Sequence, residues 1–181
     1  MEKGGQCMIE ISDVLQSVDS VNSISKELDS IVEGIIEPQC KELDDYITYV
    51  KQLVDDTNTP IRDAELEDII LTIPSLLYFM GTLQENIGIR EDIAKFDKTD
   101  KYNQIVTSAQ GTVQAKTALA DLETRNEALA IIVYQRAKRK LQTKYEIALE
   151  LLQSTKKILN RRLAELELSK SSLNKSANNF N

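Results

Sequence analysis

Nine basic residues between positions 136 and 162 are the strongest chemical feature of this sequence. On a helix with about 100° per residue, seven of them share an arc of roughly 140° that lies away from the leucine-rich seam. Cations in a row on a rigid helix can neutralise a phosphate backbone, and such binding weakens as salt rises. The nucleic-acid-binding prediction names these seven: Arg136, Arg139, Lys140, Lys144, Lys157, Arg161 and Arg162.

The distribution of charge leaves two other interpretations open. Residues 1–70 hold 17 acidic and 5 basic residues, whereas residues 131–181 hold 4 acidic and 11 basic ones. The basic arc, which Glu146 and Glu150 interrupt, is therefore either a solvated helix face or a surface for the acidic N-terminal half of the same or another subunit. Such pairs add little stability each when exposed, but they fix register and orientation.

Catalysis is disfavoured by composition, because the chain has no histidine. Histidine is the usual general base near neutral pH and the commonest metal ligand. Two acidic groups could bind magnesium for a phosphate reaction, but acids near a helix start also serve the helix dipole. These groups are Glu42 with Asp44 and Asp45, and Glu65 with Glu67 and Asp68. We therefore predict no enzyme activity, no cofactor and no metal site.

The two cysteines, Cys7 and Cys40, are too few for a disulfide framework. The polar, acidic N-terminus has no secretion-signal pattern. The longest apolar stretches, around residues 73–80 and 128–134, fall short of the roughly 20 residues that a membrane span needs. These features predict a soluble, cytoplasmic protein without a membrane partner.

The helix that must position the basic residues is very long. No proline or glycine follows Gly111, and an apolar stripe runs at helical spacing from Thr112 to about Lys170. This pattern predicts one helix of more than fifty residues, which spans on the order of 80 Å at about 1.5 Å per residue. Assembly of further subunits along its seam is predicted for Leu141, Leu152, Leu159 and Leu163.

The first half of the chain also has helical periodicity. Val14, Val21, Leu28 and Ile35 lie seven apart, as in helices that wrap a partner helix. Pro38 predicts a kink or short break. Two further starts are predicted: a short helix from Pro60 to about Leu71, capped by Thr59, and a new helix at residues 72–74, which ends before Gly111.

Together these elements predict an all-α protein, an elongated antiparallel helical hairpin or bundle with coiled-coil character. Its expected segments are an acidic heptad-patterned region at 1–58, a helical core at 59–168 and a mobile polar tail at 169–181. A long rod exposes more seam than shorter helices cover, so a homo-oligomer is expected.

Residues 72–77 (Thr-Ile-Pro-Ser-Leu-Leu) lead into a helix and a polar connection. The segment from Leu122 to Arg162 follows, with a tyrosine- and lysine-rich helical pattern. Over roughly residues 64–168 this arrangement resembles the tailed-phage recombination mediators called UvsY-like. The resemblance implies a ring-like oligomer that binds single-stranded DNA and helps to load a recombinase onto DNA coated by single-strand-binding protein.

The sequence thus predicts a phage accessory protein of the host cytoplasm, whose basic residues contact single-stranded DNA or a protein bound to it. The alternative is a structural or scaffolding coiled-coil protein, such as a virion or morphogenesis component, whose charges only match neighbouring subunits.

Overall fold

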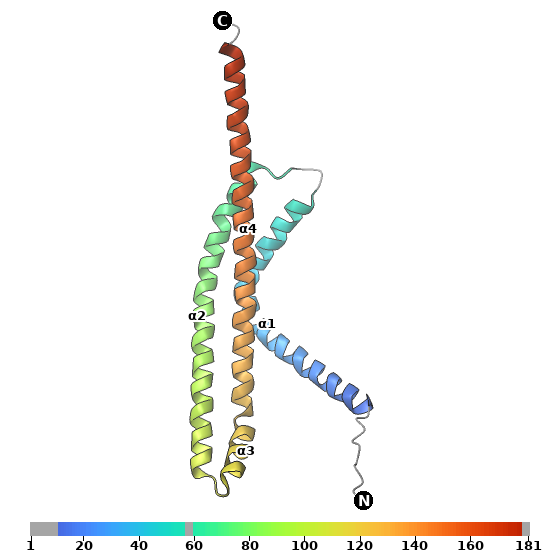
Figure 1. Cartoon of the computed structure of the whole chain (residues 1–181), viewed down its shortest axis with the longest axis vertical. Coiled ribbons are helices and arrows are strands. Elements are labelled where there is room, and N and C mark those ends of the chain that lie inside the picture. Colours follow the sequence, from blue (N-terminus) through green and yellow to red (C-terminus); the bar gives the residue numbers. More distant parts are fainter. Residues whose placement is uncertain (1–10, 57–59, 179–181) are drawn as a thin grey trace, which may run out of the picture.

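The computed structural model describes residues 11–56 and 60–178, and within these ranges the chain is all-α. Four helices follow one another without a strand: α1 (Ile11–Asp55), α2 (Asp63–Ser108), α3 (Val113–Glu123) and α4 (Arg125–Asn178). The predicted fold class is confirmed. The molecule is elongated, with α2 and α4 side by side, α3 at one end and α1 crossing the pair (Figure 1).

Helices α2 and α4 form the predicted antiparallel hairpin. Their cross-helix contacts show the direction, because partners further along α2 lie earlier on α4. Three hydrogen bonds show this trend from α2 to α4: Asp63 with Arg162 at 2.8 Å, Gln84 with Gln142 at 2.9 Å, and Lys101 with Glu127 at 2.8 Å. The short connection through α3 brings the two long helices together, as in other helical hairpins.

Helix α4 confirms the predicted rod of more than fifty residues, with 54 residues. Its start differs from the prediction, because Thr124 separates it from α3. The Thr124 hydroxyl donates a hydrogen bond to the Ala120 carbonyl at 2.8 Å. The backbone of Thr124 has a ψ angle of 12°, which lies outside the helical range. The far end also differs. The helix passes the expected limit near Lys170 and continues to Asn178, into the segment predicted as a tail.

Helix α2 corrects two predicted starts. It begins at Asp63 rather than Pro60, with the Glu65 carboxylate accepting from the Arg62 backbone N–H at 2.8 Å; Thr59 lies outside the described residues. It also continues through Pro74, where a new helix was predicted. A proline removes one helical hydrogen bond. Burial of Ile73 and Leu77 on either side of Pro74 offsets that loss.

Gly111 ends the α2 region as predicted. Its φ of 119° lies in the left-handed region that glycine adopts readily. Helix α3 then begins at Val113, with the Thr112 hydroxyl accepting from the Ala115 N–H at 3.3 Å. The turn reverses the chain direction between the two long helices.

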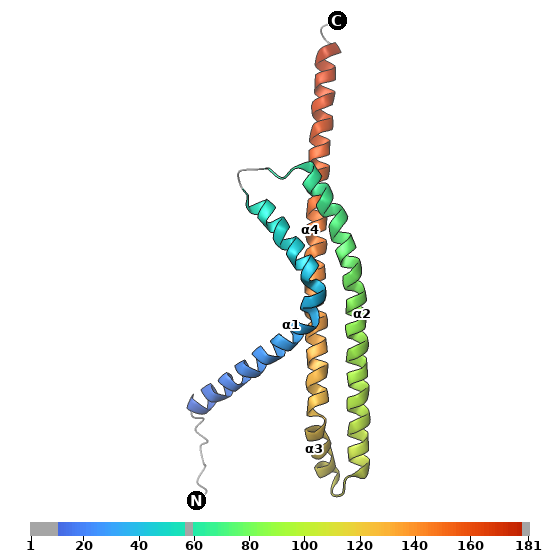
Figure 2. The ribbon, with the colours of Figure 1, turned by 180° about the vertical axis from the view of Figure 1, so that it is seen from behind.

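Helix α1 contains Pro38 and bends near its middle, so the expected kink is present without a break. The part of α1 before the bend diverges from the hairpin in both views (Figures 1 and 2). The part after the bend keeps contacts with it, because Val50 is buried in the core and the Tyr46 hydroxyl donates to Asp68 of α2 at 2.8 Å. We call residues 11–31 the α1 arm.

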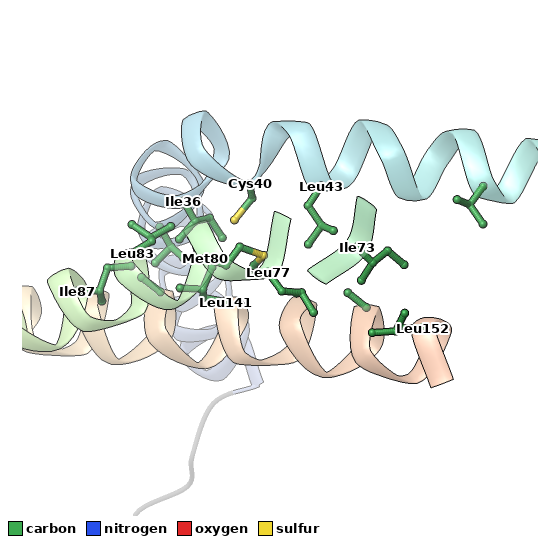
Figure 3. Close-up of a cluster of buried hydrophobic side chains, with 14 of the residues drawn as sticks. Ile36, Cys40, Leu43, Ile73, Leu77, Met80, Leu83, Ile87, Leu141 and Leu152 are labelled. Atoms are coloured by element: carbon green, nitrogen blue, oxygen red, sulfur yellow. The ribbon is translucent and has the colours of Figure 1, made fainter. Parts of the chain in front are cut away.

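The core is a three-helix cluster centred on that bend (Figure 3). Helix α1 contributes Ile36, Cys40 and Leu43; the same cluster contains Ile73, Leu77, Met80, Leu83 and Ile87 from α2, and Ala137, Leu141, Ala148 and Leu152 from α4. Burial raises the pKa of the Cys40 thiol. Aliphatic side chains therefore fix the three helices relative to one another.

Candidate assembly and nucleic-acid-binding surfaces

Three of the seven predicted nucleic-acid-binding residues face α1 instead of open solvent. Arg136 pairs with Asp29 at 3.2 Å, Lys140 pairs with Glu33, and Lys144 donates to both oxygens of Asp44 at 2.5 and 2.7 Å. The acids and bases advance in the same direction, so α1 and α4 are locally parallel. Pairing of the acidic N-terminal helix with the basic helix, one of the alternatives above, occurs here within one chain.

Two more of the seven make other contacts. The Arg162 Nη1 group donates to the Ile61 carbonyl at 2.6 Å and to Asp63 at 2.8 Å, which holds the start of α2 against α4. The Arg161 Nε group donates to Glu165 one turn away at 2.8 Å, and its side chain is 82% exposed. Arg162 therefore has a structural contact, whereas Arg161 faces solvent.

The remaining two, Arg139 and Lys157, are exposed and have no ion pair with any residue that the structure describes. Lys156, which lies outside the predicted arc, is also exposed. The seven predicted residues are thus divided. Four hold helices together, Arg139 and Lys157 remain open to an anion, and Arg161 is exposed with an ion pair only to Glu165 of its own helix.

Four of the six carboxylates considered for magnesium have protein partners: Asp44, Asp45, Glu65 and Asp68. Asp44 accepts from Lys144, and Glu65 accepts from the Arg62 guanidinium at 2.7 Å, which lowers the pKa of Glu65. Asp68 accepts from the Tyr46 hydroxyl at 2.8 Å. Burial and this hydrogen bond raise the pKa of Tyr46 to about 12. Among the described residues, no three cysteine or acidic side chains are grouped as a metal site would require.

The four leucines predicted for assembly have different environments. Leu141 is fully buried and Leu152 is buried, both in the core of their own chain. Leu159 is half-buried where α2 begins, and Leu163 is 48% exposed. Only Leu159 and Leu163 are therefore accessible to another subunit in this arrangement.

From Leu152 onward, leucines recur at every seventh position of α4, a repeat that was not predicted from the sequence and that continues beyond Leu163. Leu152, Leu159, Leu166 and Leu173 lie seven apart, which places a leucine at each d position over four heptads. Because α2 begins opposite Arg162, residues 163–178 of α4 project past the hairpin, over about 24 Å at 1.5 Å per residue. Leu166 is 50% exposed there. We call this segment the α4 extension.

A buried charge lies between α2 and α4. The Glu91 carboxylate is 2.6 Å from Lys95, accepts from the Gln135 amide at 3.2 Å and is 4.0 Å from Lys138. Hydrogen bonding to Lys95 is the main cause that lowers the pKa of Glu91, against the opposing effect of burial. Glu91 therefore fixes the register of the hairpin by polar contacts within an apolar seam.

We expect Glu91→Gln to remove a pH-dependent part of the stability. Because the folded pKa lies below the unfolded value, ionised Glu91 stabilises the fold above the unfolded pKa, and this stabilisation is lost as pH falls through the folded pKa. At neutral pH the variant should lose about 1–3 kcal/mol of unfolding free energy, and the difference from wild type should shrink once the pH is below the unfolded pKa of about 4.3. Urea unfolding in both pH ranges measures this. Glu85→Gln, an exposed site on the same helix, is the control, and an equal loss in both variants would contradict the prediction.

Within the described ranges, α2 is the one helix that is long and apolar enough to cross a membrane, by length and composition alone. The prediction from sequence judged the apolar stretches too short. Core helices of soluble proteins also satisfy this test, and α2 buries Ile73, Leu77 and Met80 against α1 and α4. Its opposite side exposes Leu71, Tyr78 and Phe79. Helix α2 is thus apolar on both sides near Pro74.

The fold and surfaces define an all-α bundle of long helices with unpartnered apolar faces. Comparisons with protein-family models, curated proteins and solved structures found no match for the chain. The resemblance to UvsY-like mediators therefore stays a prediction from the sequence pattern.

Proposed function

We propose that this chain is a non-enzymatic structural subunit that associates with further copies of itself through the α4 extension. The observation that supports this proposal is the leucine heptad, which continues where the intramolecular partner of α4 ends. Leu163 and Leu166 are about half exposed on one face, at positions a and d of the repeat. A seven-residue repeat favours a second helix that wraps around the first, and another α4 extension has the matching repeat.

The positions around these leucines suit a two-stranded, parallel pair. Lys156 and Lys170 occupy the other a positions, where a polar residue favours a defined register at a cost in stability. Arg162 and Glu167 stand at successive g and e positions. In parallel strands these positions meet across the interface, so Arg162 of each copy faces Glu167 of the other with opposite charge.

The test replaces the leucines of this face. Leu163→Lys with Leu166→Lys should weaken association about 100-fold or more, because each buried leucine contributes roughly 1.5–3 kcal/mol. Leu168→Lys is the matched control, since Leu168 is 71% exposed on the other side of the same helix. Light scattering after size-exclusion chromatography gives the molar mass of each variant. An assembled mass that the double substitution leaves unchanged would refute the proposal.

Single-stranded DNA binding is a second candidate function, because Lys156, Lys157 and Arg161 remain exposed just before the α4 extension and Arg139 remains unpaired among the described residues. In this proposal, the protein assists recombinase loading as the mediator resemblance implies. The ion pairs of α1 with α4 favour the structural function instead, since they occupy the centre of the basic arc.

Titration with single-stranded DNA at two salt concentrations tests this second candidate. Arg139→Glu, Lys157→Glu and Arg161→Glu together should reduce affinity and lower the slope of log affinity against log salt by about one for each phosphate that is no longer neutralised. Exchange of Lys26, Lys41 and Lys51 for glutamate changes net charge equally on α1 and is the control. Absence of binding by the assembled wild-type chain at low salt would exclude the candidate.

A further inference from the structure

The α1 arm diverges from the hairpin although its sequence has the repeat of a helix that packs on another helix. Ile11, Val18, Ser25 and Val32 occupy the a positions of its heptads, and d residues alternate with them. Only the end of the arm next to the bend reaches the core: Leu28 packs against the core, and Val32, the first residue after the arm, is buried in it. Further out, Leu15, Val18 and Val21 are about half exposed or more. From Leu15 to Val21, the apolar side chains of the arm are thus without a partner among the described residues.

An open apolar groove of about 640 Å³ lies between this arm and the first turns of α4. Ile24, Leu28 and Ile31 line its α1 side, and Leu129, Ala130 and Val133 line its α4 side. Figures 1 and 2 show that the arm leaves α4 at an angle, and the residues that line the groove belong to the two helices on either side of that angle. Its walls have the side chains of a helix-binding groove, which receives the apolar face of an amphipathic helix.

We infer that the α1 arm of a second copy fills this groove, and that the two copies exchange arms reciprocally around a twofold axis. The contact joins two arms and two α4 helices into a four-helix bundle. This interface is separate from the α4 extension, because it lies at the opposite part of α4. In a twofold contact the same surface of both copies takes part, so that surface must complement itself. Each contact between a residue of one copy and a residue of the other therefore occurs twice.

The charges of the groove favour an identical partner. Glu27 on α1 and Arg125 on α4 both line it, and neither has an ion pair with a described residue. A second arm brings its own Glu27 toward Arg125, and the symmetry repeats this contact. The e and g positions beside the stripe are Leu15, Ser17, Asn22, Ile24, Asp29 and Ile31. Asp29, the one charged residue among them, pairs with Arg136 in its own chain, so identical arms approach without strong repulsion.

The test mixes two charge-reversed chains, each in a Leu163→Lys and Leu166→Lys background that removes association through the α4 extension. Glu27→Arg alone places two cations in each contact, and Arg125→Glu alone places two anions there. Each variant should dimerise about tenfold more weakly than the background chain. An equimolar mixture restores opposite charges in both contacts, so a heterodimer should form with the affinity of the background chain. Asp19→Arg, an equal charge change at a b position of the arm, should leave dimerisation unchanged.

Sedimentation equilibrium with one variant fluorescently labelled measures these constants. The inference is overturned if the background chain stays monomeric at every concentration, or if mixing gives no heterodimer. A third outcome would also overturn the inference: the mixture forms no heterodimer, but a chain that has both Glu27→Arg and Arg125→Glu dimerises as the background chain does. That outcome would place the contact between residues 27 and 125 within one chain. A negative result here does not contradict the proposed association through the α4 extension. That proposal is tested separately, by the mass change that Leu163→Lys with Leu166→Lys causes.

Discussion

Leu141→Ala is expected to lower the free energy of unfolding by about 2–5 kcal/mol, one of the two largest effects of a single substitution in this chain. Leu141 is fully buried, in the same cluster as Ile36 of α1 and Met80 of α2. Alanine removes apolar contacts to both neighbouring helices and leaves a cavity that two long, straight helices cannot close easily. Urea unfolding followed by circular dichroism measures the loss.

Leu168→Ala is the control for this prediction, since Leu168 is 71% exposed on the same helix. It should change stability by less than about 0.5 kcal/mol. If Leu141 instead contributed mainly to contacts between subunits, its variant would change the assembled mass and leave the unfolding of dilute protein nearly unchanged. That result would contradict the three-helix core.

Ile36→Ala is the second large effect, because Ile36 is fully buried at the bend through which α1 contacts the hairpin. The variant should lose about 2–5 kcal/mol, and the loss should fall on the attachment of α1. Hydrogen exchange should therefore accelerate in residues 32–50, while α2 and α4 keep most of their protection through their own contacts.

Leu15→Ala is the comparison for α1, since Leu15 is an exposed apolar residue on the same helix. Its effect on exchange in residues 32–50 should be small. Equal acceleration in α1, α2 and α4 after Ile36→Ala would show that the three helices unfold as one unit and would contradict a separately attached α1.

The long rod was predictable because a continuous stripe without proline or glycine has few structural alternatives. The all-α class follows from the same periodicity. The break at Thr124 was not predictable, because threonine is compatible with a helix interior and only the packing of α3 on α2 separates the two segments. Local sequence therefore determines the type of element better than its boundaries.

Pro74 shows the opposite error. A proline after threonine and isoleucine has the pattern of a helix start, yet α2 continues through it. The burial of Ile73 and Leu77 against the other helices outweighs one missing hydrogen bond and the clash with the preceding turn. Tertiary packing of this kind has no signal in a window of a few residues.

The candidate surfaces were predictable only in part. Charge segregation indicated that acidic and basic helices could pair, but the register that selects Asp29, Glu33 and Asp44 depends on the bend of α1. The seam of α4 was evident, whereas the division between Leu141, buried inside the chain, and Leu163, left exposed, depends on where α2 begins. One sequence does not distinguish a partner helix of its own chain from that of another copy.

The molar mass of the unmodified chain as a function of concentration tests most directly the claim that its unpartnered apolar faces bind further copies. The account predicts an average mass that rises with concentration from 20.4 kDa to a multiple of that value when the assembly is complete. A constant mass of 20.4 kDa up to about 100 μM would contradict it. That result would mean that the free energy of association is weaker than roughly 5.5 kcal/mol.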